Sequence, residues 1–388
     1  SSDLAGNIVP VDNITGLSVL RVDNTTPVFS SFSPDTGAFM NGLNTFGWTL
    51  SETIESGSVA FKQKSGPGSD TSIVLVGTEL VAGIRAPNAF TGFVDPFLID
   101  GTIYDIIYTS IDTAGNTGLD TIANVSYDTT APIVTLTFDQ LFGAKDSVIL
   151  VTATWDERAL PTPTITVNYG GDISTLDDIS NAAMDPTPGD STIWTYPITI
   201  PGEDVNNGPV SFTIVGTDLA ENAFDPATLV MVDTLVVDNI LPMVTFSYSN
   251  VSQPTLTNRG KAGDIIDITA TFTEPTHLIN DPLLNIAYAT DPDANVAPTT
   301  SSNDDSVWTY RITLLDSAYN TGYITITSGA TDRAGNSIGT YVDNAVFLAD
   351  NTLPTFSFTE PDSGTYVNHK LVGYSLSESV LSGSITWT

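Results

Sequence analysis

Alternating apolar and polar residues, with the period of two that belongs to a β-strand, are the clearest pattern in this chain. The pattern is cleanest in residues 266–273. One face there carries Ile266, Ile268, Ala270 and Phe272, and the other carries Asp267, Thr269, Thr271 and Thr273. These residues predict a strand that is buried on one side. Because no amphipathic helix of useful length is found along the sequence, we expect an all-β fold.

Short apolar runs separated by turn residues continue this pattern through residues 23–127. Strands are expected near 46–50, 58–62, 72–76, 103–111 and 121–127. Tyr104 in the run Asp-Gly-Thr-Ile-Tyr has the spacing of the tyrosine corner of immunoglobulin-like sandwiches, in which a Tyr early in strand F bonds to nearby backbone. Trp194 and Trp308 lie in runs rich in Thr, Ile and Tyr, so we expect both in the core rather than on a ligand surface.

A junction recurs along the chain: an Asp-x-Ala-Gly-Asn turn, a short β-like run, and then Asp, three residues and Pro. The turn occupies residues 3–7, 112–116, 218–222 and 332–336, with Glu221 in place of Gly in the third copy. The linker Asp that follows is Asp23, Asp128, Asp238 or Asp350. A Glu comes 29, 29, 36 and 28 residues after these, at Glu52, Glu157, Glu274 and Glu378. The order and spacing indicate a small domain repeated end to end.

The linker Asp residues are 105, 110 and 112 residues apart, which is the size of one β-sandwich domain. We therefore expect tandem immunoglobulin-like β-sandwich domains in an extended array. Residues 1–22 are expected to be the C-terminal end of a preceding repeat, 23–127, 128–237 and 238–349 to be three domains, and 350–388 to be the N-terminal part of a further repeat. The segments 128–237 and 238–349 match each other as one subtype, and 23–127 and 350–388 match as another.

The three repeated acids should meet at one pole of each sandwich. The incoming linker, the loop after the second strand and the loop between the last two strands lie at the same end of an immunoglobulin-like domain. Carboxylates at ~4 Å repel by several kcal/mol near a protein surface, and Arg333 is the one basic residue inside the repeated motifs. Calcium, which binds carboxylate, amide and backbone oxygens and water, is the natural counter-ion. The candidate ligand sets are Asp23, Glu52, Asp112 and Asn116; Asp128, Glu157, Asp218 and Asn222; Asp238, Glu274, Asp332 and Asn336; and Asp350 with Glu378.

A second interpretation of the same residues needs no metal. Asp-x-Ala-Gly-Asn forms a turn in which Asp accepts backbone N–H bonds and Gly supplies positive φ, and the linker Asp caps a turn before Pro. Glu221 favours this interpretation, since it suggests a turn that does not need glycine. If calcium is bound, it fixes a hinge and turns the string of domains into a rod.

Charge and composition limit the partners. The 388 residues carry a net charge of −34, from 45 acidic and 11 basic residues, which argues against nucleic acid or an anionic membrane as partner. Cys is absent and His occurs twice, so no zinc cluster is expected. Asp outnumbers Glu by 36 to 9, which suits turns and calcium sites better than acidic helices. No apolar run has membrane-spanning length.

These motifs resemble the bacterial Ig-like repeats of large extracellular adhesins and of surface-layer or fibre proteins. Asp-x-Ala-Gly-Asn, followed after a strand by Val-Asp-x-Thr-x-Pro, is a recurrent signature of those arrays, and the resemblance covers essentially the whole chain. Leu-Ser-Glu, Ser-Gly-Ser-(Ile/Val) and Asp-Gly-Thr-x-Tyr are similar to one subtype of them. The resemblance implies an extended extracellular stalk or lattice at the cell surface, with calcium at domain junctions in some members. It names no ligand.

Three functions compete. The leading hypothesis is a structural or spacer segment of a giant extracellular protein, in a filament, sheath, surface layer or adhesin stalk, with neighbouring repeats and copies of itself as partners. The alternative is an adhesin domain that binds a glycan or surface partner through residues 62–95, which are rich in Gly, Ser and Pro. An enzyme is not expected, because the carboxylates recur in every repeat and no nucleophile elbow, phosphate loop or Cys and His chemistry is found.

Overall fold

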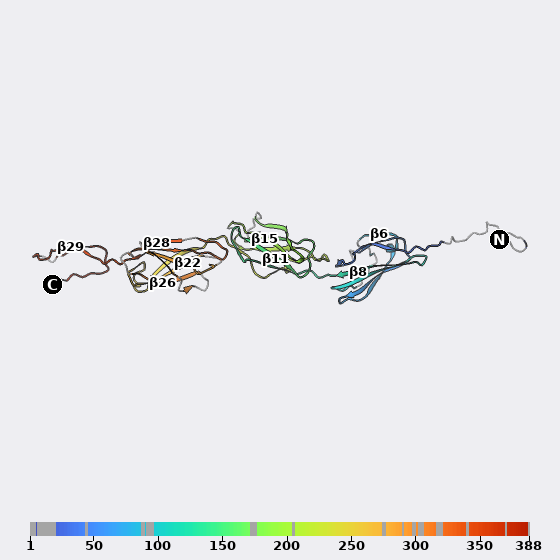
Figure 1. Cartoon of the computed structure of the whole chain (residues 1–388), viewed down its shortest axis with the longest axis horizontal. Coiled ribbons are helices and arrows are strands. Elements are labelled where there is room, and N and C mark those ends of the chain that lie inside the picture. Colours follow the sequence, from blue (N-terminus) through green and yellow to red (C-terminus); the bar gives the residue numbers. More distant parts are fainter. Residues whose placement is uncertain are drawn as a thin grey trace.

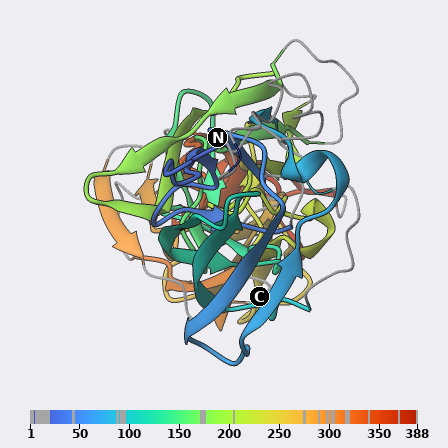
Figure 2. The same cartoon turned by 90° about the vertical axis from the view of Figure 1, so that its right-hand side faces the viewer.

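The computed structural model is an extended array of β-rich units. Figure 1 shows the units laid end to end in chain order, and Figure 2, seen along the array, shows them one behind another. Apart from two short 3₁₀ turns, every element among the described residues is a strand. The structure describes residues 5, 21–42, 46–86, 90, 97–170, 177–203, 206–273, 277–288, 291–296, 300–301, 306–315, 321–338, 341–368 and 371–386. No helix in these ranges is long and apolar enough to span a membrane.

The first sandwich packs a three-stranded sheet on a five-stranded one. The smaller sheet has the order β1 (Phe29–Ser33), β3 (Gly47–Leu50) and β6 (Gly83–Arg85). The larger has the order β2 (Phe39–Met40), β8 (Thr117–Tyr127), β7 (Thr102–Ile111), β4 (Ser56–Ser65) and β5 (Thr71–Val74), and a 3₁₀ turn, η3 (Gly77–Leu80), precedes β6. The tyrosine-corner prediction is confirmed, because the hydroxyl of Tyr104 accepts a 3.2 Å hydrogen bond from the backbone N–H of Ile99.

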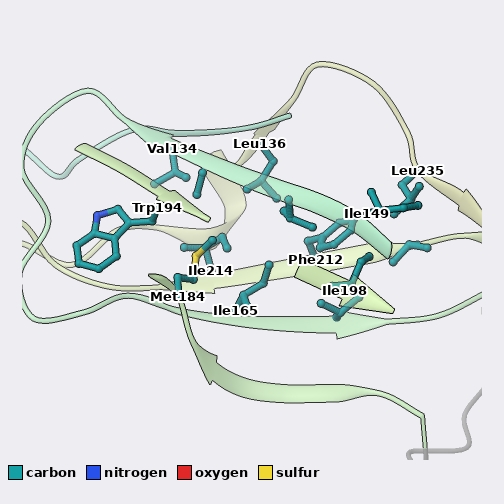
Figure 3. Packing of buried hydrophobic residues seen from close by; sticks show 14 of the residues in the cluster. Val134, Leu136, Ile149, Ile165, Met184, Trp194, Ile198, Phe212, Ile214 and Leu235 are labelled. Carbon is teal, nitrogen blue, oxygen red and sulfur yellow. The ribbon is translucent and has the colours of Figure 1, made fainter. Parts of the chain in front are cut away.

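The second sandwich encloses the core shown in Figure 3. One sheet has the order β14 (Asp185–Thr187), β15 (Asp190–Thr199), β11 (Val148–Trp155), β9 (Val134–Phe138) and β18 (Val230–Met231). The facing sheet has the order β13 (Ile179–Ala183), β12 (Thr164–Asn168) and β17 (Ser211–Val215), and a small sheet joins β10 (Phe142–Gly143), β19 (Val236–Val237) and β16 (Gly208–Pro209). Val134 and Ile149 from the first sheet share one buried cluster with Ile165 and Ile214 from the second. Trp194 belongs to this cluster, as predicted.

The third sandwich repeats the plan. One sheet has the order β20 (Met243–Asn250), β22 (Ile265–Thr273), β26 (Val307–Thr313) and β25 (Thr300–Ser301). The other has the order β21 (Arg259–Gly260), β28 (Tyr341–Ala349), β27 (Gly322–Ser328), β23 (Leu284–Tyr288) and β24 (Asp291–Val296). The predicted alternation is confirmed in β22, whose residues Ile266, Ile268, Ala270 and Phe272 are all buried. Trp308 is buried in the same core.

The three cores are separate, which makes this a tandem array of immunoglobulin-like β-sandwiches. The buried clusters draw on residues 29–125, 134–237 and 244–347, and each falls inside one of the expected domains. The domain boundaries themselves stay a prediction. Beyond the third core, β29 (Phe356–Glu360) pairs with β30 (Gly373–Leu376). Most of the expected segment 1–22, including all of the turn at 3–7 except Ala5, lies outside the described residues.

Candidate metal centre

The linker Asp begins where the last strand of the preceding sandwich ends. The backbone N–H of Asp128 still donates to Met40 O, at 2.9 Å, so the residue belongs to the end of that sandwich. Its carboxylate then caps a turn, because Oδ1 accepts a hydrogen bond from the backbone N–H of Thr130 at 3.0 Å. The same turn forms at Asp23, Asp238 and Asp350, with distances of 2.9, 3.0 and 3.1 Å. The capped turn before Pro is therefore confirmed at all four junctions.

The Glu of each set follows a residue that fixes the first strand. Ser51 Oγ accepts from the backbone N–H of Val28 at 2.9 Å, and in the next repeat Asp156 Oδ1 accepts from Ile133 N–H at 2.8 Å. In both repeats the strand ends in a bend, and the residue after each anchor lies in that bend. Glu52 and Glu157 are these residues, and both reach the junction.

The Asp-x-Ala-Gly-Asn turn also forms as the second interpretation requires. Asp112 Oδ1 accepts from the backbone N–H groups of Ala114 and Asn116, both at 2.8 Å, and its Oδ2 accepts from Asn116 Nδ2 at 2.8 Å. Asp218 makes the matching three bonds at 2.7, 2.9 and 2.8 Å. Glu221 takes φ 68°, as Gly115 takes φ 89°. The turn thus forms with Glu221 in the left-handed conformation that Gly115 takes in the first copy, so it does not require glycine at this position.

Two of the four predicted sets converge closely. One carboxylate oxygen each from Asp23, Glu52 and Asp112 lie within 4.8 Å of one another, and the same holds for the acids of the second set, Asp128, Glu157 and Asp218. Within the described ranges, the ion pairs join Lys62 to Asp70, Lys64 to Asp105 and Arg311 to Asp267. None of these pairs neutralises either cluster. Each of the two clusters therefore brings three acidic side chains together, and no basic side chain in the described ranges forms an ion pair with them.

The surroundings of Glu52 and Glu157 disfavour the ionised forms of these two side chains unless a cation is near. Burial, and then the charges of Asp128 and Asp218, raise the pKa of Glu157 to about 7. Burial, followed by Asp23 and Asp112, raises the pKa of Glu52. Oε1 of Glu52 is also enclosed and accepts no hydrogen bond. An enclosed carboxylate oxygen without a donor fits a bound metal ion, which would take the place of the missing donor.

The third and fourth sets are less complete. Asp238 and Asp332 are both buried, and burial together with the charge of Asp238 raises the pKa of Asp332. Glu274 lies outside the described residues. Asp350 and Glu378 line one cleft, and Oε1 of Glu378 is enclosed without a hydrogen bond. Arg259 and Lys261 line the same cleft.

The Asn of each turn holds the linker through its amide nitrogen. Asn116 Nδ2 donates to the backbone oxygen of Asp23 at 3.1 Å, and Asn222 and Asn336 make the same bond to Asp128 and Asp238, at 3.0 and 2.7 Å. The same nitrogen also donates to the Asp of its own turn, at 2.8 Å in each copy. These hydrogen bonds therefore give the Asn residues a clamping role, and their role as metal ligands stays a prediction.

Sequence reasoning missed a second clamp, on the upstream side of the linker. Thr129 donates its backbone N–H to Asp100 Oδ1 at 2.6 Å, and Thr130 Oγ1 donates to Asp100 Oδ2 at 2.8 Å. These bonds and the other bonds to Asp100 lower its pKa. The peptide group between Asp128 and Thr129 is thus bonded to the second sandwich through its C=O and to the first through its N–H.

The next junction builds the same clamp from different residues. Asn239 donates its backbone N–H to Asn207 Oδ1 at 2.8 Å, and its own Oδ1 accepts from Lys145 N–H at 2.7 Å. The preceding carbonyl, that of Asp238, accepts from Asn336 on the third sandwich. One peptide group is again held from both sides. Asp100 opens the Asp-Gly-Thr-Ile-Tyr run and Asn207 also precedes a Gly, but the side chain differs between the two repeats, so the repeated junction motif did not include them.

The segment expected to bind a glycan is part of the first sandwich where it is described. Of residues 62–95, β5 pairs with β4 and β6 pairs with β3, and Arg85 donates to the backbone oxygens of Thr78 and Val81. Residues 87–89 and 91–95 lie outside the described residues. The segment therefore supplies two strands of the sandwich, and glycan binding there stays a prediction.

Comparison with known proteins found solved structures of low sequence identity and low TM-score. No family model matches the chain, and no curated protein matches it. A 1.5-MDa bacterial ice-binding adhesin, described for host cell surface retention, is 14% identical over 85% of this chain and 100% of its own, with a TM-score of 0.34. The Escherichia coli adhesin FdeC is 10% identical over 82% and 96%, with a TM-score of 0.36. The FN1–FN3 domains of chicken CNTN1 are 11% identical over 82% and 98%, with a TM-score of 0.25. Because these TM-scores are low, the fold assignment of this chain rests on its own strand order and buried cores.

Proposed function

We propose that this chain is a non-enzymatic structural segment of a large extracellular repeat protein, which acts as a spacer in a filament, sheath, surface layer or adhesin stalk at the cell surface. We further propose that calcium rigidifies its domain junctions. One observation carries the proposal: at two junctions the linker Asp lies within 4.8 Å of two acids from the loops of the following sandwich. A linker and the domain it enters can thus share one ion.

The residues present fit calcium. The donors are carboxylate oxygens, which a hard divalent cation prefers. In the first set the turn bonds occupy Oδ1 of Asp112 twice and its Oδ2 once, so Oδ2 keeps a lone pair. Glu52 contributes the enclosed oxygen without a donor. The turn and the metal site are therefore compatible, because different lone pairs of the same carboxylate serve each.

The expected effect is mechanical rather than a large gain in folding stability. Extracellular calcium sites bind at about 10⁻⁴–10⁻³ M, so about 1 mM calcium adds about 0.4–1.4 kcal/mol per site. That is enough to bias a linker that hydrogen bonds already hold on both sides. Asp23 and Asp128 would bring the linker to the ion, and Glu52 and Glu157 the loop after the second strand. The ion would then couple the direction of each linker to the sandwich that follows.

Calcium titration calorimetry of the whole chain tests the proposal. Wild type is compared with a Glu52→Gln and Glu157→Gln double variant, in which one carboxylate of each cluster loses its charge while its shape is kept. A Glu55→Gln and Glu221→Gln double variant is the matched control, because both of these residues are exposed and lie near the same loops. We expect the first double variant to lose most of the heat of binding and the control to keep it. Equal binding by all three proteins would contradict the proposal that calcium binds at these junctions.

A further inference from the structure

Tension along the array enters and leaves each sandwich through its first and last strands, here called its terminal strands. They are β1 and β8 in the first sandwich, β9 and β19 in the second, and β20 and β28 in the third. Hydrogen bonds between neighbouring strands lie across the strand direction. A pull along a terminal strand therefore loads all of its pairs together, and a strand with more pairs withstands more load.

A short parallel clamp joins the beginning and the end of every sandwich. β2 pairs with the end of β8, β10 with β19 and β21 with the end of β28, each over two residues. The linker Asp closes each clamp, because its backbone N–H donates to the second residue of the short strand, at 2.9, 3.0 and 2.9 Å in chain order. The clamp is the same in all three sandwiches, so differences in resistance come from the terminal strands.

The first two sandwiches each have one terminal strand with few pairs. β1 pairs three residues with β3, and a register shift between Ser30 and Ser33 interrupts them. A bond from the backbone N–H of Phe29 to Asp120 Oδ2 on β8, at 2.9 Å, is added to these. In the second sandwich β19 is two residues long and pairs both with β10 and with β16. A pull on β1 or on β19 is therefore opposed by few strand pairs.

Both terminal strands of the third sandwich are long. β20 pairs eight residues with β22 without a register shift, and β28 pairs six with β27. The linker does not distinguish the second sandwich from the third, because Asn351 repeats the bonds of Asn239. Its Oδ1 accepts from Ala262 N–H at 2.6 Å, and its backbone N–H donates to Thr321 Oγ1 at 3.2 Å. Neither terminal strand of the third sandwich is thus held by as few pairs as β1 or β19.

We propose that this array bears tension and that its third sandwich is the last to open under load. A pull breaks the weakest attachment of a sandwich first, which is that of β1 in the first sandwich and that of β19 in the second. Opening of these two lengthens the chain while the third keeps its fold. This inference goes beyond the spacer role and does not depend on calcium, because hydrogen bonds between strands carry the load.

Single-molecule force spectroscopy of the whole chain, held at its two ends in excess chelator, tests the order of opening. Cys is absent from the sequence, so one introduced disulfide identifies one sandwich. Ser58→Cys with Thr109→Cys joins paired residues of β4 and β7, and Thr152→Cys with Thr195→Cys joins paired residues of β11 and β15. Neither disulfide lies on a terminal strand. Each shortens the unfolding step of its own sandwich by roughly 150–180 Å, at ~3.6 Å per residue.

The shortened step should precede the last full-length step in both marked chains, and the last step should need the highest force. Reductant should restore the full-length step. A disulfide that strengthens its own sandwich delays the shortened step, so this bias works against the proposal. A shortened step that comes last, or steps in random order, would overturn the proposal.

A proline variant tests whether bonds to a terminal strand carry the load. Leu348→Pro removes the donor of the bond from Leu348 N–H on β28 to Asn258 O, at 3.0 Å. The lifetime of the third sandwich at fixed force should fall about fivefold. Thr327→Val is the matched control, because it removes the 3.2 Å bond from Thr327 Oγ1 to Asn285 O, between β27 and β23, neither of which is a terminal strand.

The control should lower the melting temperature and leave the lifetime at fixed force unchanged. An equal loss of lifetime in both variants would contradict the proposal, since the bonds would then contribute only to general stability. The marked chains decide the order of opening whether or not Leu348→Pro folds.

Discussion

Calcium binding at the second junction should depend strongly on pH. Burial and the charges of Asp128 and Asp218 raise the pKa of Glu157 to about 7 when no cation is bound. Calcium must displace this proton, because a carboxylate binds a metal in its ionised form. With a pKa of about 7, Glu157 is protonated in about one-tenth of molecules at about pH 8 and in about nine-tenths at about pH 6. The affinity of this site should therefore fall about tenfold over that interval.

Titration calorimetry at about pH 8, 7 and 6 measures this change. A Glu157→Gln variant serves as the comparison, since it removes the titrating group and keeps the side-chain shape. We expect its affinity to be lower at about pH 8 and nearly constant down to about pH 6. The reasoning is refuted if wild type binds equally well at both ends of the interval, or if the variant keeps the full pH dependence.

Three further results are expected. In chelator, protonated Glu157 contributes stability that is fully present below about pH 4.5 and lost as pH rises through about 7, so the melting temperature of wild type should fall relative to Glu157→Gln between about pH 4.5 and 7 and stay lower at higher pH. Asn222→Ala removes hydrogen bonds to Asp218 and to the carbonyl of Asp128, which should lower the free energy of unfolding of the second sandwich by about 1–3 kcal/mol in denaturant titrations; no change would show that the clamp does not hold the turn. Tyr104→Phe should cost about 0.5–1.5 kcal/mol in the first sandwich by the same assay, and a neutral result would deny the tyrosine corner a stabilising role.

Strand periodicity and sandwich topology were enough to predict much of the junction. The alternation of apolar and polar residues in 266–273 predicted strand β22 and the face that it buries. Since strand ends meet at the poles of a sandwich, residues 29 positions apart, such as Asp128 and Glu157, could be placed together before any coordinates were known. The turn and the acidic cluster are alternative interpretations of the same residues in the sequence. The structure confirms the turn and keeps the three acids close together, so the two are compatible.

Contacts that depend on tertiary pairing were beyond the sequence. The upstream clamp uses Asp100 at one junction and Asn207 at the next, so different side chains make the same bond and no repeat reveals it. In the second sandwich β18 pairs with β9, and the sequence does not reveal this pairing. β18 is two residues long, and a pattern of period two cannot be recognised in so short a strand.

Small-angle X-ray scattering of the whole chain, first with millimolar calcium and then with excess chelator, tests the central claim most directly. The account predicts a long rod in calcium and, in chelator, a shorter average length with greater flexibility, since each linker is then held by hydrogen bonds alone. The Glu52→Gln and Glu157→Gln double variant should resemble the chelated protein under both conditions. An unchanged profile would contradict the account and would leave the prolines, the Asn clamps and the linker turns as the features that set the shape of the array.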